Sequence, residues 1–227
     1  MLARALRTHS ETVATLREVA LMPRDLAPVL PVAQPGDDVV VLVHGFFASA
    51  GVFRPLKESI ERGANALVAS FTHPPGARIE SIARSLAKLI QRMPRGVRVH
   101  IVGHSLGGLV ARWYVQELGG HDHVEQTISL GSPFGGSPVA KRFPFMVGLD
   151  LHPTSPILER LRARASEHEV PHVSVAGADD RLVSVGAALA FPYGDHLSFE
   201  RRGHNSLLYD PEVAALVVRR IRERRNT

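Results

Sequence analysis

A tight turn flanked by glycines is the feature of this sequence that most restricts its fold. The hexapeptide Gly103-His104-Ser105-Leu106-Gly107-Gly108 directly follows residues 97–102, an apolar run with β-branched residues that predicts a buried strand. A strand, a G-x-S-x-G turn and a helix in this order form a nucleophile elbow, in which glycines on both flanks let the neighbouring elements close around the serine. The turn strains the serine backbone and lifts its hydroxyl out of the sheet. Ser105 is therefore the candidate nucleophile.

A second junction between strand and loop lies upstream. The continuous apolar run 39–43 predicts a strand buried on both faces, as in the centre of a parallel sheet. The turn that follows, through His44 and Gly45, directs the amide of Phe46 toward the end of the sheet, where it can pair with the amide of Leu106. Two such donors form an oxyanion hole. The alternative is an ordinary turn, which the downstream elbow disfavours.

The remaining candidate groups follow in a defined chain order. Residues 173–177 predict a strand, Asp179 and Asp180 stand in the loop after it, and His204 precedes a helical C-terminal segment. A serine hydroxyl is a weak nucleophile at neutral pH, so a histidine must accept its proton and later return it to the leaving group. A carboxylate fixes the tautomer of that histidine. Serine, acid and histidine in this order are typical of one class of hydrolases.

With these residues in place, the chain resembles the bacterial lipases and esterases of the α/β-hydrolase superfamily, in particular the small members similar to triacylglycerol lipases. The resemblance extends from residue 39 to about residue 220. Five motifs carry it: HGFFAS at 44–49, GHSLGGLVARWY at 103–114, LGSPFGGSPVA at 130–140, GADDRLV at 177–183 and GHNSLLYDPEV at 203–213. The resemblance implies an α/β-hydrolase fold, with a mostly parallel central sheet, helices on both faces and a short cap or lid.

The resemblance also assigns roles. It implies Ser105 as nucleophile, Asp180 as the acid, His204 as the base, and the amides of Phe46 and Leu106 as the oxyanion hole. The family pattern selects Asp180 over Asp179 because of its distance from the glycine that ends the strand. His196 is the alternative base and Asp150 the alternative acid. His44 is expected to stabilise the turn behind the oxyanion hole.

The alternation of elements supports one α/β domain. We expect strands at 39–44, 66–70, 98–103, 124–130, 172–177 and 196–200, and helices at 52–62, 77–92, 106–118, 155–168 and 211–224. Hydrophobic residues make up 44% of the chain, enough to fill the core of a sheet of six to eight strands. Residues 1–35 are predicted to form a helical extension and residues 36–227 the catalytic domain, with a cap at about 132–168.

The substrate pocket is expected to be apolar. Residues 143–151 are apolar and interrupted by proline and glycine, which suits a short lid or an acyl-chain wall, although a loop that covers the core would look similar. The residues predicted to contact substrate are Phe47, Phe134, Phe143, Phe145 and Met146. In the family run that Gly131 begins, Phe134 and Gly135 stand where a histidine and a basic residue are usual.

Residues 1–22 predict an amphipathic helix, with Leu2, Leu6, Val13, Leu16 and Ala20 near one face. We expect it to pack on the first strands of the sheet. The alternative is a helix on a membrane surface that brings the protein into peripheral contact with lipid. The segment is too interrupted by charges to be a signal peptide, so the expected location is cytoplasmic.

Charge and residue composition limit the binding partners and cofactors that we expect. The formal net charge is +5, but the arginines are scattered except near the C-terminus, where they suit the solvated face of the last helix, so no nucleic-acid partner is expected.

The run His121-Asp122-His123, with His168 and His172, lacks a complete ligand set for zinc, so no metal is expected. The sequence has no cysteine, which excludes a thiol nucleophile. No cofactor is implied, and the sequence does not indicate an oligomeric state.

The predicted activity is hydrolysis of carboxylic esters, as by an esterase or lipase, through an acyl-enzyme on Ser105. The substrate would be a small-molecule or lipid ester. An acyltransferase or a thioesterase would use the same residues and differ in the acceptor or the leaving group. A protein that keeps the fold only to bind a ligand is a further alternative, disfavoured because binding does not require a strained serine with its base.

Overall fold

The central sheet has six parallel strands in the computed structural model, which describes residues 11–25, 27–138, 140 and 147–225. The strand order is β2-β1-β3-β4-β5-β6. Their bounds are β1 Asp38–Val43, β2 Leu67–Phe71, β3 Arg98–His104, β4 Val124–Leu130, β5 His172–Gly177 and β6 Asp195–Phe199. The chain adds β2 on one side of β1 and β3 on the other side. The order in which strands are added to the parallel sheet therefore reverses between β1 and β3. Ligands of open parallel sheets bind outside the carboxyl ends of the strands at such a reversal.

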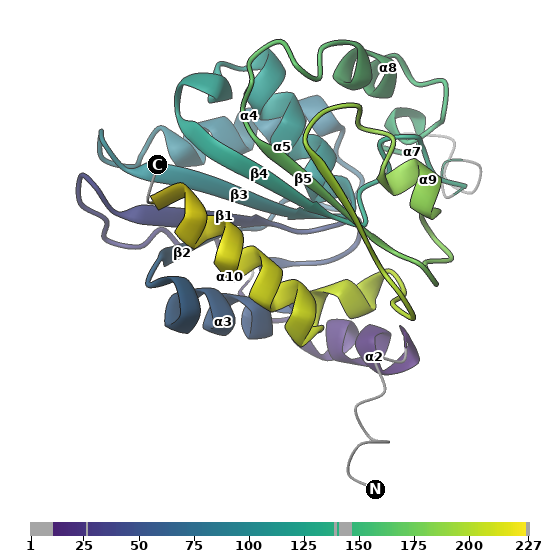
Figure 1. The fold of residues 1–227 in the computed structure, drawn as a ribbon, viewed down its shortest axis with the longest axis horizontal. Helices are drawn as coiled ribbons and strands as arrows, with labels where there is room; N and C mark the ends of the chain where they lie inside the picture. The colour runs from purple at the N-terminus through teal and green to yellow at the C-terminus, as the bar shows by residue number, and fades with distance from the viewer. Residues whose placement is uncertain (1–10, 26, 139, 141–146, 226–227) are drawn as a thin grey trace, which may run out of the picture.

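Helices cover both faces of the sheet, with α3 and α10 on one side and α4, α5 and α8 on the other (Figure 1). The predicted fold class is thereby confirmed. The α-helices are α2 Glu11–Leu21, α3 Arg54–Ala64, α4 Ile79–Ile90, α5 Leu106–Glu117, α7 Val147–Asp150, α8 Pro156–Ala163, α9 Val185–Ala188 and α10 Pro211–Arg225. Three 3₁₀ turns complete the described part, η1 Ala50–Phe53, η2 Gly120–Asp122 and η3 Asn205–Leu208.

Three predicted helices begin or end two or more residues from the expected bounds. One of them, the helix expected at 77–92, spans Ile79–Ile90. The helix expected at 52–62 begins at Arg54, after a 3₁₀ turn, because Pro55 has no backbone N–H and fits only the first turn of an α-helix. The helix expected at 155–168 ends at Ala163. The next residue, Arg164, has a φ of −106° and a ψ of 19°, outside the α-helical region, and so ends the helix.

The strands alternate their side chains between two hydrophobic cores. In β1, Val39, Val41 and Val43 pack with α4 and α5, whereas Val40 and Leu42 pack with α3 and α10. All five are at most 1% exposed. A strand that is apolar at every position is therefore required, because both of its faces are covered by helices.

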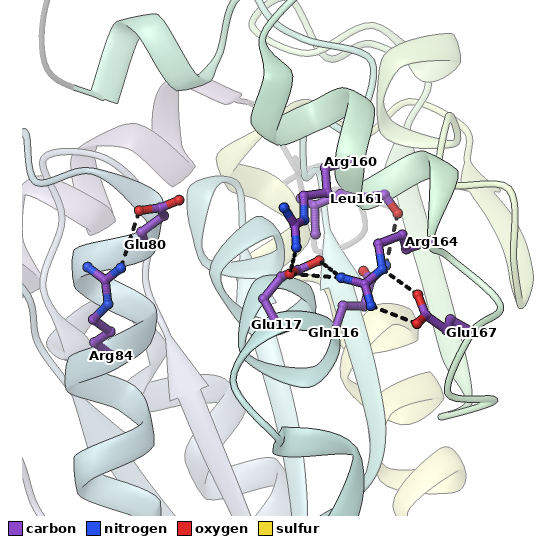
Figure 2. A network of polar contacts seen from close by, with 8 residues as sticks. All are labelled: Glu80, Arg84, Gln116, Glu117, Arg160, Leu161, Arg164 and Glu167. Carbon is purple, nitrogen blue, oxygen red and sulfur yellow. Dashed lines mark hydrogen bonds and ion pairs between the residues drawn. The ribbon is translucent and has the colours of Figure 1, made fainter.

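Helix α8 is joined to α5 by ion pairs (Figure 2). The Glu117 carboxylate, 8% exposed, accepts hydrogen bonds from Arg160 at 2.5 Å and from Arg164 at 2.8 Å. Arg164 also pairs with Glu167, and the Gln116 side-chain amide donates to the carbonyl of Leu161 at 3.1 Å. Polar contacts therefore fix α8 against the end of α5.

The N-terminal helix α2 packs mainly against η1 and η3, rather than on the first strands as expected. Ala14 is buried, whereas Val13, Leu16 and Val19 are 40%, 65% and 60% exposed. The apolar side predicted from the sequence therefore faces solvent over its described part, and Leu2 and Leu6 lie outside the described residues. None of the described helices combines the length and hydropathy that crossing a bilayer requires.

Candidate active site

Ser105 stands at the turn between β3 and α5, at the carboxyl end of the sheet. Its φ of 53° and ψ of −118° are strained for a residue with a side chain. A Cβ on Gly107 would lie 1.9 Å from the Val43 carbonyl oxygen, and one on Gly103 would lie 2.3 Å from the Gly107 carbonyl carbon. Only glycine permits this approach, so the turn has the backbone of a nucleophile elbow.

His204 and Asp180 are brought together from two loops at the same end of the sheet. The Nδ1 atom of His204 lies 2.7 Å from Oδ2 of Asp180, and the two side chains are 6% and 1% exposed. The other carboxylate oxygen accepts hydrogen bonds from the amides of Leu182 and Val183, both at 2.8 Å. The carboxylate is therefore fixed in position by the backbone. Asp179 is exposed and is not the partner of His204.

The histidine before the nucleophile holds the loop of the candidate base. His104 Nε2 lies 3.2 Å from the carbonyl oxygen of His204, and the two rings are 4.7 Å apart. Since a carbonyl only accepts, His104 Nε2 is the donor. Complete burial, together with the charge of nearby His204, keeps the pKa of His104 well below its usual value. His104 therefore remains a neutral support at ordinary pH.

A cavity of about 230 Å³ lies at this end of the sheet. Ser105 and His204 both line it, and among the described residues no hydrogen bond joins their side chains. Such a bond is often long without substrate and shortens in the complex. The other lining residues are Glu18, Gly45, Phe46, Phe47, His104, Pro133, Ser137, Leu151, Leu182, Val183 and Asn205. The wall is mainly apolar.

The two predicted oxyanion residues flank the nucleophile. Phe46 lines the cavity just beyond β1, and β1 pairs with β3 so that Val43 lies opposite Gly103. Leu106 is the first residue of α5, where an amide has no acceptor within the helix. Both positions are consistent with amides that point at a substrate oxygen.

The predicted substrate-contacting residues divide into three groups. Phe47 lines the cavity and is 52% exposed. Phe134 does not line it: the side chain is fully buried, with its ring 4.8 Å from that of Phe191. Its assignment to the substrate pocket is corrected accordingly, because an apolar ring at this depth packs the core. Phe143, Phe145 and Met146 lie outside the described residues.

The alternative acid and base are engaged elsewhere. Asp150 is fully buried and accepts hydrogen bonds from Arg78 Nε at 2.6 Å and from the Ile79 amide at 2.9 Å, so it caps α4. His196 donates to the carbonyl of Phe191 at 2.6 Å. Neither of them contacts His204 or Ser105.

His44 supports the turn behind the candidate oxyanion hole. Its Nδ1 donates to the carbonyl of Gly45 at 2.8 Å, and its Nε2 accepts from the amide of His73 at 3.1 Å. Burial and the neighbouring His73 lower the pKa of His44 to about 3. A ring that stays neutral fits the structural role expected of it.

The histidines considered for a metal lie in different surroundings. His121 stacks on His168 with centroids 3.8 Å apart, whereas His172 is buried beside Thr127 and Ser174. Within the described ranges, no three histidine, aspartate or glutamate side chains gather in a way that could hold a metal ion.

Two parts of the cavity were missed by the sequence analysis. Leu182 and Val183 line the cavity and follow Asp180 closely in the GADDRLV motif. Their short distance in sequence from the acid could have predicted that they lie near the site. Glu18 comes from α2, far from every motif, and no local pattern pointed to it.

The comparison with protein families identifies the fold. The sequence model described as the alpha/beta hydrolase fold matches residues 38–151, from the start of β1 through the elbow to the end of α7. The chain belongs to the alpha/beta hydrolase fold family. A search of curated proteins gave no match.

Solved structures share this hydrolase fold at low sequence identity. The mature form of Bacillus licheniformis lipase BlEst2 superposes with a TM-score of 0.69 at 17% identity, over 86% of this chain and 97% of that one. The monoacylglycerol lipase of Paleococcus ferrophilus gives 0.69 at 19% identity, over 87% and 98%. The metagenomic carboxyl esterase MGS0156 gives 0.66 at 17% identity, over 86% and 78%. At these identities the comparison shows a common fold.

Proposed function

We propose that this hydrolase-fold chain is a serine hydrolase of carboxylic esters that works through an acyl-enzyme on Ser105. One observation carries the proposal. His204, whose ring pairs with the Asp180 carboxylate at 2.7 Å, lines the same cavity as the strained Ser105. A fold kept for binding alone would not require this arrangement.

In the proposed reaction, His204 takes the proton of the Ser105 hydroxyl while the oxygen attacks the ester carbonyl. The amides of Phe46 and Leu106 stabilise the negative oxygen of the tetrahedral intermediate. When the bond to the alcohol breaks, His204 gives its proton to the departing oxygen. Water, deprotonated by the same histidine, then attacks the acyl-enzyme and releases the acid. Asp180 keeps the tautomer that presents Nε2 to the serine.

The cavity supports a substrate with a short acyl group. Its volume of about 230 Å³ is below the roughly 300–1,000 Å³ of sites for drug-sized ligands. Phe47 and Leu182, 52% and 43% exposed, form an apolar rim. We therefore expect esters of short to medium acids to be turned over faster than those of long-chain acids.

The test is release of 4-nitrophenol from acyl esters that range from acetate to palmitate, by the wild type and by Ser105→Ala. Turnover by the wild type and a loss of several orders of magnitude in the variant would support the proposal. Labelling of Ser105 by a fluorophosphonate, read by mass spectrometry, reports the nucleophile independently of the substrate.

Absence of both turnover and labelling in the folded wild type would refute the proposed function. A second comparison uses added alcohol as a competitor of water for the acyl-enzyme. If the ester product dominates in dilute alcohol, the chain is an acyltransferase with the same residues.

A further inference from the structure

The N-terminal helix α2 is fixed to the loop that carries His204. The two carboxylate oxygens of Glu11 accept hydrogen bonds from the amides of Asn205 at 2.7 Å and Ser206 at 3.1 Å. A Cβ on Gly203 would lie 2.3 Å from Glu11 Oε2, so glycine is needed there for the contact. At the other end of the helix, the Ser49 hydroxyl donates to the carbonyl of Met22 at 2.7 Å. Contacts at both ends therefore set the position of α2.

Glu18 follows Glu11 by two helical turns and lies on the same side of α2. It is partly buried and lines the cavity beside Asn205. Burial raises the pKa of its carboxyl, while the charge of His204 and a hydrogen bond from the Asn205 side chain act in the opposite direction. Of the described residues that line the cavity, Glu18 is the only acidic one.

The position of Glu18 relates it to one part of an ester. In the proposed reaction His204 delivers a proton to the departing alcohol, so this alcohol must lie next to the imidazole. Glu18 stands on α2, which packs against η3 directly after His204, and it lines the cavity together with His204 and Asn205. Its carboxylate therefore lies on the side of the cavity where the alcohol leaves, rather than along the acyl chain.

We propose that Glu18 forms an anionic subsite for the leaving group, which favours esters of alcohols that carry a positively charged ammonium group. The inference rests on the proposed ester hydrolysis and adds the class of alcohol. A carboxylate in a mainly apolar cavity attracts a cation more strongly than one in bulk water, because the surroundings screen the charge less. The same charge disfavours alcohols that carry a carboxylate.

The experiment compares two butyrate esters of similar shape at pH 8. Butyrylcholine carries a trimethylammonium group, and 3,3-dimethylbutyl butyrate carries a neutral tert-butyl group in its place. The readout is the ratio of kcat/KM for the charged ester to kcat/KM for the neutral one. Differences in intrinsic reactivity cancel when this ratio is compared between protein variants.

Glu18→Gln should lower the ratio by about tenfold, since it removes the charge and keeps the shape. The matched control is Glu58→Gln, the same change on the outer face of α3, where Glu58 pairs with Arg62 at 3.5 Å. The control should keep the wild-type ratio. In the wild type, rising salt should lower the ratio, because ions screen the attraction.

An equal ratio in wild type and folded Glu18→Gln would overturn the subsite. If that variant does not fold, the wild-type salt series decides, and a ratio that is independent of salt overturns the proposal. Hydrolysis of 4-nitrophenyl butyrate is measured alongside. Its presence with an unchanged ratio refutes the subsite alone, and its absence together with the absence of Ser105 labelling refutes the proposed function and the subsite with it.

Discussion

The Nδ1 atom of His204 and the Oδ2 atom of Asp180 lie 2.7 Å apart, although the two residues are 24 positions apart in the chain. Asp180 stands just after β5 and His204 just before η3. The backbone amides of Leu182 and Val183 hold the second carboxylate oxygen. The acid is therefore oriented before any substrate arrives, which is what a fixed tautomer of His204 requires.

Asp180→Asn should lower kcat for 4-nitrophenyl butyrate by about 10⁴, because an amide stabilises the wrong tautomer of His204. The fold should survive, since the amide oxygen can still accept from the backbone. Asp179→Asn changes the exposed neighbour and is the matched control, with kcat within about twofold of the wild type. Equal activity of the two variants would contradict the assignment of Asp180.

Gly103→Ala should destabilise the protein by about 3 kcal/mol or more and abolish activity. The new Cβ would lie 2.3 Å from the backbone of Gly107 and Gly108, and neither backbone atom can move without opening the elbow. Gly186→Ala is the control, because a Cβ there has no atom within 4 Å and the residue lies in α9. Urea unfolding would measure both, and a wild-type midpoint for Gly103→Ala would contradict the prediction.

Stability should fall as the pH decreases below about 6.5. Burial lowers the pKa of His44 to about 3, lowers that of His73, and keeps those of His104 and His172 well below the usual value. Above pH 6.5 these rings are neutral in both folded and unfolded chains. Below it the unfolded chain binds protons that the folded chain excludes, which costs up to about 1.4 kcal/mol per pH unit for each ring.

Urea unfolding at pH 8, 6.5 and 5 would measure this loss. A free energy of unfolding that stays constant from pH 8 to pH 5 would show that the buried rings do take up protons in the folded state. His152→Asn, a change at an exposed histidine, serves as the control and should leave the slope with pH unaltered.

Glu117→Gln should destabilise the protein by about 1–2 kcal/mol, because it removes the charge that two arginines of the α8 region share (Figure 2). Glu80→Gln breaks a single exposed pair with Arg84 at 3.4 Å and should cost less than about 0.5 kcal/mol. Thermal unfolding of both variants gives the comparison. A larger loss for Glu80→Gln would contradict the view that Glu117 fastens α8.

Local sequence determined the strands, the helices and the tight turn that carries Ser105. The apolar run of β1 can only be a strand covered on both faces, and the glycines around Ser105 leave one way to join β3 to α5. These features depend on residues close in sequence, so their patterns are readable without the fold. The motif order then brought Ser105, Asp180 and His204 to the same end of the sheet.

Tertiary structure alone decided which side chains reach the cavity. The amide of Asn205 meets Glu11 across 194 positions of the chain, and this contact fixes α2, whose Glu18 lines the same cavity as His204. Phe134 lies only a few residues after β4 but is turned into the core, and Asp150 is used to cap α4. A pattern of a few residues fixes backbone conformation. The direction of a single side chain depends on packing between distant elements, which no local pattern records.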